Sequence, residues 1–128
     1  MKRYSHIFEK IANLDNIMEA INKAAKGKKD RKEVKRILDD PLFYANQIKE
    51  LLINKKYIPC KSHEFKIKDG VSKKERIINK PKFYPDQIIH HSIILQIEKC
   101  FMRGMYHYSC ASIKNRGIYY ASKYLKKY

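Results

Sequence analysis

The sequence predicts an α+β fold that is mostly helical and carries one basic β-hairpin. Apolar residues recur every three or four positions over residues 7–52, which is the spacing of amphipathic helices. Around Asp69-Gly70 the period falls to two, as in antiparallel strands joined by a turn. The expected order is three helices, a hairpin and two further helices. A chain of 128 residues with 44% hydrophobic residues can bury a core of this kind.

The first helix is expected to begin at Ser5, as its N-cap, and to end at Ala25. Its inward stripe consists of Ile7, Ile11, Leu14, Met18, Ile21 and Ala25. The run Lys26-Gly27-Lys28-Lys29 follows directly. Because it contains a glycine among lysines, we expect it to form a basic turn that ends the helix.

Two further helices are expected before residue 55. Asp30 and Glu33 have the spacing of a capping box for a short second helix, whose inward residues are Val34, Ile37 and Leu38. Asp40-Pro41 predicts the start of a third helix, with Asp40 as the cap and Pro41 at the first helical position. The inward residues of that helix are Leu42, Ala45, Ile48 and Leu52.

The hairpin is predicted from alternation on both sides of a turn. Phe65 and Ile67 alternate with polar residues, and Arg76-Ile77-Ile78 resumes an extended run after Asp69-Gly70. Because the connection is longer than a two-residue turn, we expect the hairpin to project as a basic flap.

Two more helices are expected after the hairpin. The segment that begins at Asp86 is apolar on most sides, so we expect a helix buried in the core. A last helix is expected to begin near Arg116, with Ile118, Ala121 and Leu125 facing inward.

Charge is the strongest compositional signal. The 29 Lys and Arg residues outnumber the 13 Asp and Glu residues, giving a net charge of +16. A field of that size favours polyanions, of which nucleic acid is the commonest, and ten tyrosines among basic residues suit base stacking.

No apolar run approaches the ~20 residues that span a bilayer. With no signal peptide, we expect a cytoplasmic protein with its three cysteines reduced and no membrane partner.

The hairpin carries the first candidate site. Its cations are Lys66, Lys68, Lys73, Lys74 and Arg76. Lysine acts as a point charge toward phosphate, whereas arginine can bind it through two parallel hydrogen bonds. Exposed strand edges also use lysines simply to prevent aggregation, so a solvated edge is the alternative interpretation.

Several short motifs follow the hairpin in a distinctive order. They are Arg76-Ile77-Ile78, Pro81, Asp86-Gln87-Ile88-Ile89-His90-His91, Tyr108-Ser109-Cys110, Arg116-Gly117 and Ala121. This series resembles the N-terminal fingers region of bacterial or prophage reverse transcriptases, the RNA-directed DNA polymerases of group II introns, retrons and diversity-generating retroelements. The resemblance covers roughly residues 40–128. It implies that residues 1–39 are an N-terminal helical extension and that the chain ends before the catalytic palm.

The resemblance also implies roles for individual residues. Nucleotide or template contacts would come from Lys68, Lys74, Arg76 and Arg116, and contacts to the nucleic-acid backbone from Lys66, Lys73 and Lys114. The implied partners are an RNA template, an RNA–DNA duplex, deoxynucleotides and the enzyme's own palm region. The intact enzyme would need Mg²⁺, but the chain has no Tyr-x-Asp-Asp run. Because two-metal phosphoryl transfer needs such carboxylates, we expect no catalytic residue, no cofactor and no polymerase activity in this chain alone.

Two other functions stay open at this stage. One is a stand-alone basic module that binds RNA or DNA. The other is a small interaction protein stabilised by zinc, with Cys60, His63, His107 and Cys110 as tetrahedral ligands. The gap between those two pairs is longer than in common zinc fingers. For His90-His91, which lack a neighbouring acidic residue, we expect structural roles.

Overall fold

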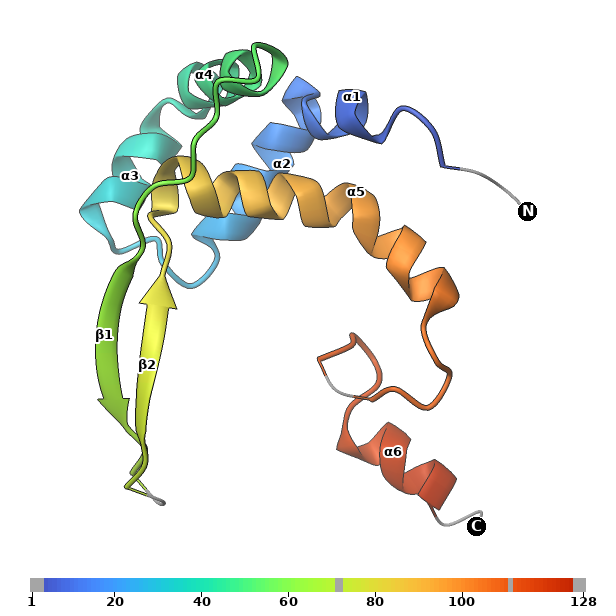
Figure 1. Cartoon of the computed structure of the whole chain (residues 1–128). Coiled ribbons are helices and arrows are strands. Elements are labelled where there is room, and N and C mark those ends of the chain that lie inside the picture. The colour runs from blue at the N-terminus through green and yellow to red at the C-terminus, as the bar shows by residue number, and fades with distance from the viewer. Residues whose placement is uncertain (1–3, 71–72, 111, 126–128) are drawn as a thin grey trace. The chain divides into compact units, whose positions relative to one another are not determined.

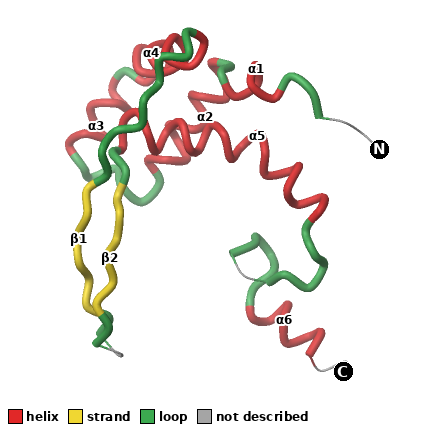
Figure 2. Tube along the Cα trace, viewed as in Figure 1, coloured by secondary structure: helices red, strands yellow, loops and turns green. Residues whose placement is uncertain are grey.

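The computed structural model describes residues 4–70, 73–110 and 112–125. In these ranges the elements are α1 (Ile7–Ile11), α2 (Leu14–Ala25), α3 (Lys32–Asp39), α4 (Pro41–Ile53), β1 (His63–Lys68), β2 (Glu75–Lys80), the π-helical turn η1 (Phe83–Gln87), α5 (Ile88–Gly104) and α6 (Ile118–Leu125) (Figure 1). Helices therefore dominate, and the two strands form one antiparallel hairpin (Figure 2). The predicted α+β class is confirmed.

The chain divides into two compact units, residues Met1–Ile97 and Glu98–Tyr128. Unit 1 holds the first four helices, the hairpin and the start of α5, and unit 2 holds the end of α5 and α6. The predicted boundary after residue 39 stays a prediction. In unit 1, α2 and α4 lie on opposite sides of that boundary in the sequence and pack against each other.

The predicted first helix is in fact two helices, so this expectation was wrong. The break falls at Ala12-Asn13, where the Asn13 side chain accepts a hydrogen bond from the Asp15 backbone N–H at 2.8 Å and starts α2. Ser5 is not a cap, because His6 occupies the N-cap position of α1, with a left-handed φ of 57°. An asparagine that bonds its own backbone thus outweighs an unbroken apolar stripe.

Of the other predicted helix boundaries, one was wrong and two are confirmed. The predicted capping box was wrong: Arg31 occupies the N-cap position of α3, with no side-chain cap. The start of α4 is confirmed, because Asp40 Oδ1 accepts a hydrogen bond from the Phe43 N–H at 3.2 Å and Pro41 is the first helical residue. The basic turn after α2 is also confirmed, with Gly27 at a φ of 73°, where glycine is favoured.

The core of unit 1 is formed by α2, α3, α4, η1 and the first turn of α5. Its buried apolar residues are Ala12, Ile17, Ala20, Ile21, Ala24, Ala25, Val34, Ile37, Ala45, Ile48, Leu52, Phe83, Ile88 and Ile89. Leu42 was expected to face inward but is 52% exposed, because the buried face of α4 is formed by Ala45, Ile48 and Leu52. Helix α5 was expected to be buried nearly all round. Only its start is, and Ile94 is 53% exposed.

One polar network lies inside this core and joins α1, α2 and α5. Asn16 Nδ2 donates to Ser92 Oγ at 2.7 Å, and Ser92 Oγ donates to the Ile11 carbonyl at 2.7 Å. Gln96 donates to the Asn16 side-chain oxygen at 2.6 Å. Among the described residues, no buried side-chain polar atom of unit 1 or unit 2 lacks a hydrogen-bond partner. The network therefore holds these helices together without leaving an unpaired buried group.

In unit 2 the predicted inward face of α6 was wrong for Ile118 and Leu125, whereas Ala121 is half-buried. Ile118 is 86% exposed and Leu125 is 77% exposed. The packing of α6 comes instead from Tyr120 and Tyr124, whose rings contact His107 in the preceding loop. Across the described parts of both units, no helix combines the length and the apolar character that crossing a membrane would require.

Candidate nucleic-acid interface

The hairpin is the most exposed element of unit 1, because every residue of both strands is exposed. Its antiparallel register pairs His63 with Lys80, Glu64 with Asn79, Phe65 with Ile78, Lys66 with Ile77, Ile67 with Arg76 and Lys68 with Glu75. Directly opposed residues lie on the same face of a hairpin, and successive residues alternate between faces. The register therefore divides the side chains into two faces of different character.

One face combines apolar residues with cations. Phe65, Ile67 and Ile78 form its centre and are only 37%, 41% and 38% exposed. Arg76 and Lys80 lie on the same face at its two ends. The His63 ring stacks on Phe65 with centroids 6.2 Å apart. This face offers stacking and apolar surface between two positive charges.

The opposite face is mostly polar, although it also carries the exposed Ile77. Its cations are Lys66 and Lys68, and Lys68 Nζ lies 3.7 Å from Glu75 Oε1 across the two strands. Both partners of that ion pair are more than half exposed, so the pair contributes little to stability. Lys68 can therefore exchange the Glu75 carboxylate for a phosphate at small cost.

Asp69 organises the turn of the hairpin. Its backbone donates to the Lys74 carbonyl and accepts from the Lys73 N–H, at 3.1 and 3.0 Å. Its carboxylate accepts from Arg76 Nη2 at 3.2 Å. Lys73 adopts a left-handed φ of 50°. The predicted cations Lys73, Lys74 and Arg76 are thus gathered at the exposed end of the hairpin, with Arg76 paired to a carboxylate.

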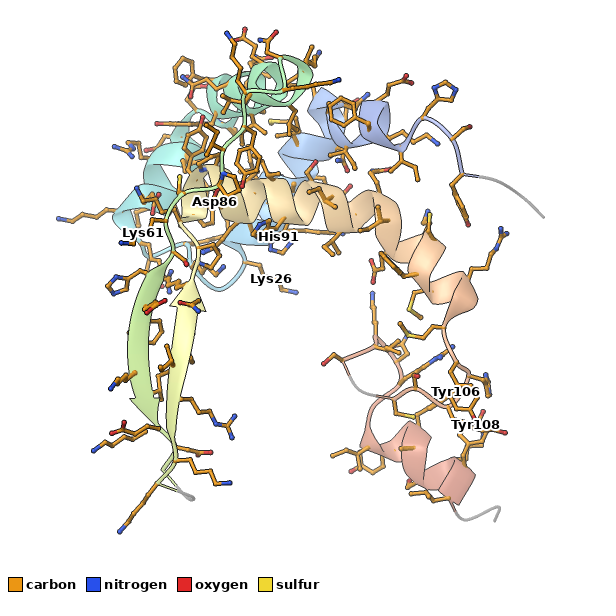
Figure 3. The ribbon with its side chains drawn as sticks, viewed as in Figure 1. Lys26, Lys61, Asp86, His91, Tyr106 and Tyr108 are labelled. Atoms are coloured by element: carbon orange, nitrogen blue, oxygen red, sulfur yellow. The ribbon has the colours of Figure 1, made fainter. Side chains whose placement is uncertain are left out.

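A buried carboxylate anchors the other end of the hairpin. Asp86 is 2% exposed and accepts a hydrogen bond from Tyr57 Oη at 2.7 Å and from the Cys60 backbone N–H at 3.2 Å. Burial raises the pKa of Tyr57, and the hydrogen bond to Asp86 raises it further. Asp86 therefore ties the segment that enters β1 to the start of α5. Figure 3 labels it there.

A second group of cations meets the base of the hairpin. Lys28 donates to Gln87 Oε1 at 2.6 Å and lies over the Phe83 ring, 5.9 Å from its centroid. Partial burial lowers the pKa of Lys28, and the nearby charges of Arg31 and Lys80 lower it further. Lys28 therefore links the turn after α2 to η1, and its charge lies close enough to Lys80 of β2 to be repelled by it.

His91 extends the same group onto α5. Desolvation lowers the pKa of His91, with further lowering by Lys28, Lys23 and His90. Mutual repulsion of this kind marks a surface that an anion would stabilise. We call Lys23, Lys28, Arg31, Lys80 and His91 the basal cluster. Its positive charge near pH 7 comes from the lysines and Arg31, because the lowered pKa leaves His91 neutral. Lys23 Nζ also lies 3.1 Å from Glu19 Oε1. Figure 3 labels His91 on α5.

Sequence reasoning missed the basal cluster. The run Lys26-Gly27-Lys28-Lys29 was interpreted only as a turn, and Lys80 was not singled out. The run itself was the available signal, because lysines beside a glycine often present charge at an exposed turn. Its closeness to β2 depends on tertiary packing, which no local pattern in the sequence reveals. A hollow of about 660 Å³, lined by Lys61, Ser62, His63, Glu64 and Lys82, also lies at the base of the hairpin.

The remaining predicted cations lie in unit 2. Arg116 Nη1 donates to the carbonyls of His107 and Tyr106, at 3.2 and 3.4 Å, and its guanidinium carbon lies 5.7 Å from the centroid of the Tyr120 ring. Lys114 is exposed. Arg116 thus holds a loop of its own unit, and a nucleic-acid contact by it stays a prediction.

The zinc hypothesis gains no support. Cys60 and His63 lie in unit 1, while His107 and Cys110 lie in unit 2. Cys110 Sγ donates to the Tyr108 carbonyl at 3.1 Å. Within the described ranges, no three or more His, Cys, Asp or Glu side chains gather as a metal site would require.

Comparisons with known proteins do not place the chain in a family: no protein-family model matches it, and no curated protein matches it significantly.

Proposed function

We propose that this chain binds the phosphate backbone of RNA, or of an RNA–DNA duplex, through its hairpin. The observation that carries the proposal is the exposed hairpin and its base. Residues 61–82 contain eight Lys and Arg residues but only three Asp and Glu residues. The strands are exposed throughout, and the basal cluster continues the positive surface onto the helices. Such a surface suits phosphate contacts that do not depend on base sequence.

We further propose that the chain is the fingers part of an RNA-directed DNA polymerase. Support comes from the order of its parts: a helical bundle, a basic hairpin, a buried aspartate and a helix, followed by Arg116-Gly117. In this role Arg76 would exchange Asp69 for the triphosphate of a deoxynucleotide or for a template phosphate. Lys68 or Lys74 would add a second positive charge.

The Mg²⁺ ions that such an enzyme needs do not fit the residues described here. Those residues contain no carboxylate cluster that could hold a metal ion. Asp86, the most buried carboxylate, is already committed to Tyr57 and Cys60. No step of phosphoryl transfer is therefore assigned to this chain, and the ions would be held by a palm region.

A stand-alone nucleic-acid-binding module is the second candidate. It is favoured by unit 1, whose described residues form a buried apolar core in which every buried side-chain polar atom has a hydrogen-bond partner. The two candidates share the phosphate contacts and differ in whether a palm is required.

Two measurements test these proposals separately. Affinity for an RNA–DNA duplex should fall steeply as salt rises, because bound cations release counterions from phosphates. Salt-insensitive binding, or none, would contradict both candidates. If the gene downstream encodes a Tyr-x-Asp-Asp segment, Arg76→Ala in the longer protein should raise the KM for deoxynucleotides. An unrelated downstream gene favours the module.

A further inference from the structure

Unit 2 contains an aromatic cavity that the hairpin interface does not use. Its volume is about 400 Å³, and it is lined by Tyr106, Tyr108, Cys110, Ala121, Tyr124 and Leu125. That size lies at the lower end of the range found for small-ligand sites. The lining is aromatic and aliphatic with a few hydroxyl and thiol groups, which suits a flat ring with polar edges.

The cavity walls are held by ring contacts inside the same unit. Tyr106 and Tyr108 meet at 66° with centroids 5.4 Å apart, and Tyr108 meets Tyr124 at 74° and 5.2 Å. Tyr124 is supported in turn by the rings of Tyr120 and His107. Edge-to-face pairs of this kind fix the ring orientations. Tyr106 stays 70% exposed at the rim of the cavity, and Figure 3 labels it beside Tyr108.

The sequence of unit 2 is rich in positive charge. Residues 98–128 contain seven Lys and Arg residues and a single acidic residue, Glu98. The guanidinium of Arg116 lies against the Tyr120 ring that supports the wall, and Lys123 precedes the lining residue Tyr124 on α6. Aromatic rings next to basic side chains are the combination with which proteins hold single-stranded nucleic acid.

We infer that this cavity holds one unstacked base of a single-stranded nucleic acid, with the adjoining phosphates held by the cations of unit 2. The inference shares with the proposed function the premise that the ligand is a nucleic acid. It differs in the site and in the form of the ligand, because the hairpin contacts backbone and the cavity takes a base. A purely apolar peptide would match the cavity walls but would gain nothing from the positive field, so charge complementarity favours the nucleic acid.

The test uses the full chain and a short single-stranded oligonucleotide. The probe carries one fluorescent adenine analogue, 2-aminopurine, flanked by abasic positions so that neighbouring bases cannot quench it. Stacking in the cavity should quench this fluorescence in the wild-type protein. Tyr106→Leu should weaken binding of the probe roughly tenfold, because a stacking ring contributes that much per base, and Tyr106→Phe should retain it. Ala121→Leu, which fills the cavity without removing a ring, should also weaken binding.

The matched control is Tyr119→Leu, which removes a 92% exposed tyrosine of α6 that does not line the cavity. It should bind the probe as the wild type does. A fully abasic oligonucleotide should bind all four variants equally. Equal losses in Tyr106→Leu and Tyr119→Leu, or a wild-type affinity that ignores the base, would overturn the cavity site while leaving the hairpin proposal intact. If the wild-type protein bound neither the probe nor an RNA–DNA duplex, both the cavity site and the hairpin proposal would be overturned.

Discussion

The helical core of unit 1 and the hairpin attached to it differ in how far their side chains are exposed to solvent. In the core, apolar residues such as Ile17 and Ile48 are completely buried, and the polar residues Asn16 and Ser92 bond to each other. In the hairpin every residue of the two strands is exposed, and the side chains of its ion pairs are all more than a third exposed. The core therefore supplies stability, whereas the hairpin contributes little to stability and presents charge.

Asp86 lies at the junction of these two regions. It is buried with the core, yet both of its partners, Tyr57 and Cys60, belong to the segment that leads into β1. A hairpin of two strands has little stability by itself in water. We therefore infer that the hairpin keeps its place through its base.

A core substitution should have the largest effect on folding. Ile48→Ala removes a completely buried side chain of α4 and should lower the free energy of unfolding by about 2–5 kcal/mol. Denaturant titration measures this change. The control Ile53→Ala alters a residue of the same helix that is 54% exposed, and it should cost less than about 0.5 kcal/mol. Similar losses in the two variants would mean that α4 does not pack as described.

Asp86→Ala tests the junction. It leaves the Tyr57 hydroxyl and the Cys60 N–H without their acceptor and should cost about 1–3 kcal/mol. Hydrogen exchange should also become faster in the strand amides nearest the base. Asp39→Ala, at an exposed position of α3, is the control. Unchanged exchange in the hairpin would refute the anchoring role.

The basal cluster predicts a smaller, pH-dependent effect. Because desolvation and neighbouring cations lower the pKa of His91 in the fold, the unfolded chain binds a proton first as the pH falls. The contribution of His91 to the free energy of unfolding should therefore be fully present well above pH 6.5. It should be lost as the pH falls from that value to the lower pKa of His91 in the folded protein, and change no further below it. His91→Gln should flatten this part of the stability curve, measured by thermal unfolding across pH. His63→Gln, on exposed β1, is the control, and an unchanged curve in His91→Gln would exclude this role.

Arg76→Gln should have the smallest effect on folding. Its ion pair with Asp69 is exposed, so the free energy of unfolding should change by less than about 1 kcal/mol. The same substitution should reduce the salt dependence of RNA binding by about one phosphate contact. Arg36→Gln, an exposed arginine of α3, should leave that dependence unchanged. A large loss of stability would mean that the hairpin is part of the core.

Local patterns predicted much of the fold. Asp40-Pro41 marked the start of α4 because both the cap and the proline act within one turn, and Asp69-Gly70 located the turn of the hairpin. The prediction of one long first helix was wrong at Asn13, because a break that preserves the spacing of the apolar residues leaves no trace in the apolar pattern. It failed again for Ile118 and Leu125, where burial depends on what else packs nearby.

The candidate site shows the same limit. The hairpin lysines could be found from sequence because they lie on one predicted element. The basal cluster could not, since Lys28 and Lys80 are far apart in the sequence and their charges interact only in the folded chain. The role of Asp86 was also missed, because its partners lie 26 and 29 residues earlier in the chain.

The most direct test of the account is the salt dependence of binding to an RNA–DNA duplex. The variant replaces four hairpin cations, Lys66, Lys68, Lys74 and Arg76, with Gln. Its matched control replaces four exposed helical cations, Lys10, Lys32, Lys35 and Arg36, with Gln, so both proteins lose the same charge. We expect the slope of log affinity against log salt to be shallower in the hairpin variant by about one for each phosphate that the hairpin no longer binds, and nearly unchanged in the control. Equal slopes in the two variants would contradict this expectation, because net charge alone would then explain the binding.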